Sequence, residues 1–130
     1  MKSYKGKIKK KITIKLIGDA EKAFNDLNKI VGEQRSQGIT SSKDITLLNA
    51  INRLFDVIVN NPFYGENVKK DLIPKEYRQK YDADNLFIAD LPDYWRMIYT
   101  LESDEIEIIA FVLDIIDHDQ YNKKFKFRKR

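Results

Sequence analysis

The chain has 130 residues, 42% of them hydrophobic and 12% aromatic, which is enough for one domain with a single buried core. It has no cysteine, which excludes disulfides and thiolate metal sites and fits a reducing compartment, and no apolar run long enough to cross a bilayer. Residues 1–17 and 123–130 hold 13 of the 24 basic residues and none of the 20 acids. We therefore expect a single cytoplasmic domain over residues 1–130, away from membranes. If the fold brings the two ends together, they form one positive surface suited to a polyanion, although such tails also serve solubility alone.

The first half of the sequence predicts a strand followed by two helices. Over residues 7–17, isoleucine and leucine alternate with lysine and threonine, a pattern typical of a strand with one buried face and one basic face. Asp19 is a candidate N-cap for a first helix, which Gly38 would end. A second apolar helical stripe covers residues 45–59 and stops before Pro62, which cannot continue a helix. These segments predict a helical hairpin lying across a sheet.

The second half predicts a short helix over Lys75–Tyr81 and then an antiparallel sheet. Three apolar runs predict its strands, and a short polar break of the hairpin type separates the last two: 85–91, 94–101 and 106–116. A brief final helix over residues 119–126 would place Tyr121 and Phe125 on one face. We thus expect an α+β fold with an N-terminal strand, a helical hairpin and a three-stranded antiparallel meander that completes a sheet with the helices on one face.

One cluster near the end of the last predicted strand has the chemistry of metal ligands. Asp114, Asp117, His118 and Asp119 combine carboxylates with an imidazole, a set that can hold a divalent cation. Against this, the chain has one histidine, and neighbours along a strand point to opposite faces. We interpret the cluster as polar residues that end a strand, and we expect neither a metal nor another cofactor.

A second group has the chemistry of RNA cleavage without a metal. That reaction needs a base for the 2′-hydroxyl, cations for the phosphorane-like transition state and a proton donor for the leaving oxygen. Arg96 lies within a predicted strand with a permanent charge, so it either reaches solvent or binds an anion. His118, or a lysine with a depressed pKa, is a candidate acid or base, and Tyr121 is a candidate proton donor or stacking group. Each residue also has a structural interpretation, as a surface histidine, a packed tyrosine or a solvated charge. Further basic candidates for contacting RNA are Lys69, Lys70, Lys75, Arg78, Lys124 and Arg128.

Three short motifs, in this order, resemble the RelE/ParE toxin superfamily. They are Asn61-Pro62 followed by Gly65, similar to the turn after its helical hairpin; Tyr94-Trp95-Arg96-Met97-Ile98-Tyr99, similar to its YRxxY-type strand; and Ile116-Asp117-His118 followed by Tyr121, similar to the end of its last strand. The likeness covers most of the chain and is best after the proline. The chain departs from the family in its long helices, in an inserted segment over residues 73–81, and in lacking an obvious glutamate where some relatives have a base.

For toxins of the RelE kind, this resemblance implies a ribosome-dependent mRNA endonuclease whose basic surface is covered by a partner antitoxin. Carried onto this sequence, it implies that Arg96 contacts the scissile phosphate and that His118 and Tyr121 lie beside it. Lys70, together with Lys69, would stabilise charge. Other members of the superfamily act on DNA gyrase or have lost toxicity. The alternative is therefore a non-catalytic binding protein of the same fold, and fold alone does not decide between them.

Overall fold

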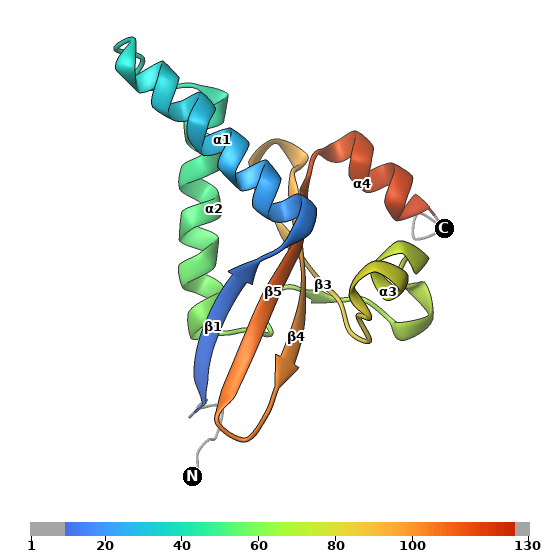
Figure 1. Ribbon diagram of the computed structural model, residues 1–130. Helices are drawn as coiled ribbons and strands as arrows, with labels where there is room; N and C mark the ends of the chain where they lie inside the picture. Colours follow the sequence, from blue (N-terminus) through green and yellow to red (C-terminus); the bar gives the residue numbers. More distant parts are fainter. Residues whose placement is uncertain (1–9, 127–130) are drawn as a thin grey trace.

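The computed structural model describes residues 10–126 of the chain. It is an α+β structure built on one five-stranded mixed sheet, in the order β1-β5-β4-β3-β2 (Figure 1). The strands are β1 (Lys11–Leu16), β2 (Glu66–Asn67), β3 (Phe87–Asp90), β4 (Arg96–Ser103) and β5 (Glu107–Ile116). The helices are α1 (Gly18–Ser36), α2 (Lys43–Asn60), α3 (Lys75–Tyr81) and α4 (His118–Lys124), with the single 3₁₀ turns η1 (Lys70–Leu72) and η2 (Pro92–Tyr94).

Helices α1 and α2 form the predicted helical hairpin, whose connection is closed by side-chain hydrogen bonds. The Ser42 hydroxyl caps α2 by accepting the backbone N–H of Ile45 at 3.1 Å, and it donates to Gln34 of α1 at 2.6 Å. The amide of Gln34 donates in turn to Asp44 at 2.8 Å. The start of α2 is therefore bonded to the last turns of α1, which fixes the angle between the two helices.

The start of α1 differs from the prediction. Asp19 is not the N-cap, because Ile17 occupies that position and the helix begins at Gly18. Gly18 has a left-handed φ of +54°, and a Cβ there would lie 2.1 Å from the hydroxyl of Tyr81, so this sharp turn requires glycine. Asp19 instead lies in the first turn, where its charge favours the helix dipole. Gly38 follows the end of the helix as predicted, with a φ of +82°.

The sheet joins the N-terminal strand to the C-terminal hairpin. β1 runs parallel to β5, and the other neighbouring strands run antiparallel. The hairpin between β4 and β5 turns at Asp104, whose carboxylate accepts the N–H groups of Ile106 and Glu107 at 2.9 and 2.8 Å. Two expectations were wrong here. The sheet has an additional two-residue strand, β2, and β4 begins at Arg96 rather than two residues earlier, so this arginine opens a strand instead of lying in its middle.

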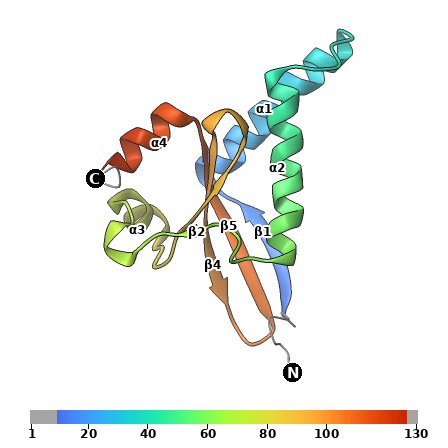
Figure 2. The ribbon, with the colours of Figure 1, turned by 180° about the vertical axis from the view of Figure 1, so that it is seen from behind.

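Helices cover both faces of the sheet rather than the one face that was expected (Figures 1 and 2). The hairpin of α1 and α2 packs on the first face, over a core that includes Ile51, Met97 and Val112. On the second face, residues of α3 and the C-terminal segment pack over a separate core that includes Tyr77 and Phe125. Strand alternation produces both cores, because successive side chains of β4 and β5 point to opposite sides.

The described chain begins and ends at separate places on the molecule. The start of β1 lies at the bottom of both ribbon views, whereas the end of α4 lies well above it (Figures 1 and 2). The lysine-rich residues 1–9 and residues 127–130 lie outside the described residues, and with them most of the expected positive surface. Among the helices of residues 10–126, none combines the length and the apolar character that a membrane span requires.

Candidate functional site

Arg96 lies where β3, β4 and β5 meet at one edge of the sheet. As the first residue of β4 it pairs with Asp90 of β3 and Ile116 of β5. Its Nε lies 3.0 Å from the Asp90 carboxylate, and its Nη1 donates to the Tyr94 carbonyl at 2.7 Å. The arginine side chain is 18% exposed and that of Asp90 is 85% exposed, so the ion pair lies at the surface and its carboxylate is free to move into solvent.

The turn before Arg96 contains Tyr94, which the sequence pattern predicts to lie in a strand. Tyr94 belongs to η2, and both Asp93 and Tyr94 have left-handed backbones, with φ of +60° and +63°. The ring centroid of Tyr94 lies 5.4 Å from that of His118, at an interplanar angle of 49°. Pro92-Asp93 is a turn signal that could have separated Tyr94 from the strand in advance.

Helix α4 brings two predicted site residues to the same edge. Asp117 caps the helix by accepting the Gln120 N–H at 2.9 Å, and the Gln120 side chain accepts the Asp117 N–H at 3.2 Å, which completes a capping box. This start places His118 in the first turn, not at the end of a strand. The guanidinium carbon of Arg96 lies 4.7 Å from the centroid of the Tyr121 ring, a cation–π contact.

Together these contacts form what we call the Arg96 cluster: Tyr94, Arg96, His118 and Tyr121. Arg96 and Tyr121 touch directly, and His118 joins through the ring of Tyr94, whose carbonyl binds Arg96. His118 is exposed and its Nε2 lies 3.2 Å from the Asn122 amide. The cluster therefore presents a permanent cation, an imidazole and two phenols at one surface, which is the chemistry that binds an anion beside an aromatic group.

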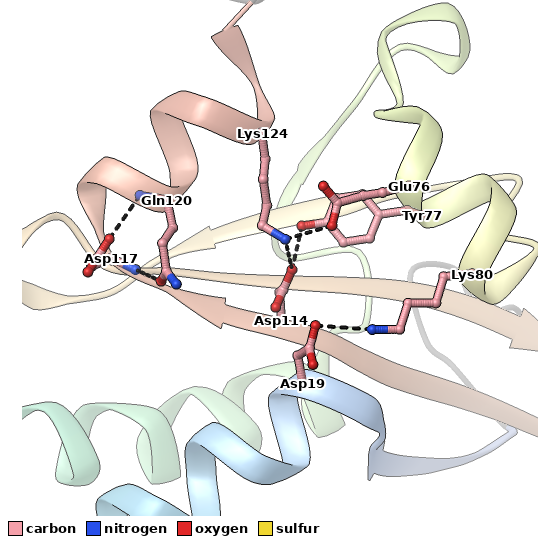
Figure 3. A network of polar contacts seen from close by, with 8 residues as sticks. All are labelled: Asp19, Glu76, Tyr77, Lys80, Asp114, Asp117, Gln120 and Lys124. Carbon is pink, nitrogen blue, oxygen red and sulfur yellow. Dashed lines mark hydrogen bonds and ion pairs between the residues drawn. The ribbon is translucent and has the colours of Figure 1, made fainter.

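Lys124, a predicted RNA contact, lies instead in a polar network between α4, α3 and β5 (Figure 3). Its Nζ lies 2.6 Å from Glu76 and 3.2 Å from Asp114, and the lysine side chain is 21% exposed. Asp114, which is 4% exposed, also accepts the Tyr77 hydroxyl at 2.7 Å. Burial disfavours the lysine charge, but the bonds to Glu76 and Asp114 outweigh burial and raise the pKa of Lys124. Its charge is thus neutralised within the fold.

The other basic candidates lie on the segment that contains η1 and α3. Lys69, Lys70, Lys75 and Arg78 are all exposed, and Lys69 and Lys70 line one shallow hollow together with Asp84. Arg78 donates to the Lys70 carbonyl, which ties α3 to η1. Within residues 10–126, no hydrogen bond or ion pair joins these four to Arg96, so they form a second basic group. Arg128 lies outside the described residues.

Two further hollows lie near the η2 turn and the start of α2, and acidic residues outnumber basic ones in the lining of each. One, of about 640 Å³, lies between η2 and the start of α2 and has Lys43 as its basic residue. The other, of about 440 Å³, is lined by Lys124 and by five carboxylates, an excess of negative charge that would repel a polyanion: Asp19, Asp26, Asp44, Asp114 and Asp117. Two of the residues considered as metal ligands have other partners: Asp114 pairs with Lys124, and Asp117 caps α4. Over residues 10–126, no group of three or more potential ligands is close enough to hold a metal ion.

The fold and the cluster define an α+β protein with an arginine, an imidazole and two phenols at one sheet edge. Comparison of the chain with protein-family models, with curated proteins and with solved structures finds no significant match.

Proposed function

We propose that the chain is a toxin of the RelE/ParE kind, a metal-independent endonuclease that cuts mRNA on the ribosome. The observation that supports this most directly is the contact of the Arg96 guanidinium with the Tyr121 ring, at 4.7 Å, beside the exposed imidazole of His118. The order of strand, helical hairpin and antiparallel strands, with this arginine opening β4, supports the same assignment. The proposed partners are the ribosome with its mRNA in the cytoplasm, and an antitoxin protein that covers the cluster.

The proposed reaction uses the RNA's own hydroxyl as the nucleophile. A base takes the proton of the 2′-hydroxyl, O2′ attacks the adjacent phosphorus, and the bond from phosphorus to O5′ breaks as O5′ receives a proton. The products are a 2′,3′-cyclic phosphate and a 5′-hydroxyl. Arg96 stabilises the additional negative charge of the transition state, while His118 and Tyr121 are the candidates for proton transfer or stacking. Lys69, Lys70, Lys75 and Arg78 would bind the flanking backbone.

The test is cleavage of ribosome-bound mRNA by purified protein, mapped by primer extension. We expect Arg96→Ala to slow cleavage about 100-fold or more, the typical effect of removing one group that stabilises a developing anion. Arg53→Ala is the matched control, because it removes the same charge from an exposed position on α2 and should cut like the wild type. Asp90→Asn, which releases Arg96 from its ion pair, should not slow cleavage.

Two results would contradict the proposal. One is an Arg96→Ala protein that is as stable in urea as the wild type and cuts mRNA equally fast. The other is a wild-type protein that leaves ribosome-bound mRNA intact. The second result, together with inhibition of gyrase supercoiling or with salt-sensitive binding alone, would favour a non-catalytic protein of this fold.

A further inference from the structure

We propose that Tyr94, supported by His118, is a stacking platform for one nucleobase next to the phosphate that Arg96 binds. The inference deepens the proposed function and rests on it, because it names single-stranded RNA as the ligand of this surface. It also gives a role to a residue that the local sequence pattern predicts to lie in a strand.

The side chain of Tyr94 is open to solvent. Tyr94 is 67% exposed, more than the exposed rings of Phe63 at 59% and Tyr64 at 54%. Its neighbour on one side is the imidazole of His118, with ring centroids 5.4 Å apart. An aromatic ring that is supported by a second ring and otherwise open to solvent is the usual form of a base-stacking site, since every base has an apolar face to offer.

The backbone that holds the ring is strained. Asp93 and Tyr94 both have left-handed φ values, of +60° and +63°, a conformation that is unfavourable for residues other than glycine. Glycine or asparagine at position 94 would make the same turn at a lower cost. The tyrosine thus contributes nothing that the turn requires, and what it adds is an exposed ring.

A hydrogen bond connects the turn that carries this ring to the guanidinium of Arg96. The carbonyl of Tyr94 accepts a hydrogen bond from Arg96 at 2.7 Å, so the turn and the charged group form one unit. A flat ring next to a fixed cation matches the two parts of a nucleotide, its base and its phosphate. In a duplex the base faces are already stacked, so this arrangement favours a single strand.

The experiment measures binding of a short single-stranded oligoribonucleotide that carries one 2-aminopurine, whose fluorescence falls when it stacks on an aromatic ring. Deoxyribose at every potential cleavage position keeps the ligand intact. We expect Tyr94→Asn to weaken binding about 10-fold and to abolish the quenching, as for the loss of one stacked base. Tyr94→Phe should retain both. Tyr64→Asn, at another exposed tyrosine that lies outside the Arg96 cluster, should bind like the wild type.

Urea unfolding of Tyr94→Asn distinguishes a loss of RNA binding from a loss of folding. Because asparagine tolerates the left-handed backbone, Tyr94→Asn should unfold at the same urea concentration as the wild type or a higher one. Equal binding and equal quenching by wild type and Tyr94→Asn would overturn the inference while leaving the Arg96 prediction standing. Quenching that depends on Tyr94 in a protein that never cuts mRNA would support the inference and contradict the proposed endonuclease. Equal affinity for an abasic oligonucleotide or a polyglutamate peptide would overturn it.

Discussion

Two basic side chains that look alike in the sequence have different electrostatic environments in the fold. Lys124 faces two carboxylates, one of which, Asp114, is buried. Arg96 faces Asp90, which is mostly in solvent, so an incoming phosphate can replace that carboxylate at little cost. A positive charge is therefore available to a ligand when the carboxylate that it leaves is solvated, and unavailable when that carboxylate is buried. By this criterion Arg96 is suited to bind an anion and Lys124 to join three elements of the fold.

Replacement of Lys124 tests this distinction at the level of one residue. We expect Lys124→Ala to lower the free energy of unfolding by about 2 kcal/mol, because it leaves the buried Asp114 with the Tyr77 hydroxyl as its remaining partner. The loss is smaller than for a fully buried ion pair because the lysine side chain is partly exposed. Lys123→Ala removes the same charge from the exposed neighbouring position and should change stability little. Urea unfolding of both variants measures the difference, and equal midpoints would contradict the structural role of Lys124.

Helix α4 is the element on which the cluster depends. Its seven residues are too few for a helix that is stable alone, so its position is set by the capping box and by packing. Phe125, just after the helix, is 1% exposed and lies between the rings of Tyr121 and Tyr77, with centroids 5.0 and 6.0 Å away. Helix α4 contains both His118 and Tyr121, so loosening of its first turn would move these two residues of the Arg96 cluster together.

Removal of the cap tests the dependence of the cluster on α4. Asp117→Ala should lower the free energy of unfolding by about 1 kcal/mol, the usual cost of losing an N-cap side chain, and should weaken RNA binding because the first turn frays. Asp117→Ser retains a capping oxygen and should recover most of the loss. Asp119→Ala serves as a control in the same turn, with a cost of a few tenths of a kcal/mol, roughly what a dipole interaction contributes. An Asp117→Ala protein with wild-type stability would contradict the assigned role of the capping box.

At the scale of the molecule, a sheet covered on both faces buries polar groups at the seam between its layers. Tyr77 from α3 reaches Asp114 on β5, and Lys124 from α4 meets the same carboxylate (Figure 3). Burial, and then the charge of Asp114, raise the pKa of Tyr77 far above the usual tyrosine value. Burial also raises the pKa of Tyr99. The folded chain therefore holds these phenols in the neutral form at pH values where the unfolded chain ionises them.

This arrangement predicts a protein that loses stability in alkali. A group whose pKa is raised on folding contributes stability that is complete below its unfolded pKa, about 10 for tyrosine, and is lost as the pH rises further. Tyr77, Tyr99 and Lys124 all have this sign. We expect the urea midpoint to be level up to roughly pH 9 and then to fall, with a shallower fall in Tyr77→Phe. A Tyr77→Phe profile parallel to that of the wild type would show that this phenol does not cause the decline.

The sequence by itself determined the features that depend on neighbouring residues. The strand pattern at the N-terminus, the stop at Gly38 and the short helix α3 follow from periodicity and from local backbone preferences, which a few adjacent residues decide. For the same reason Tyr121 and Phe125 were correctly placed on one face. Arg96 was identified because a permanent charge within an apolar run either reaches solvent or binds an anion. The structure pairs it with the Asp90 carboxylate and brings it into contact with Tyr121.

The tertiary structure alone decided which side chains meet across the chain. The contact of Tyr94 with His118 joins residues more than 20 positions apart in the chain. The burial of Lys124 against Asp114 depends on how the layers pack, and so does the covering of the second sheet face by α3 and the C-terminal segment. Local pattern carries no information about such partners, because the charge of a lysine or the ring of a tyrosine reads the same in the sequence whether it faces solvent or a buried carboxylate. Whether such a side chain faces solvent or a buried carboxylate depends on its position between the packed layers.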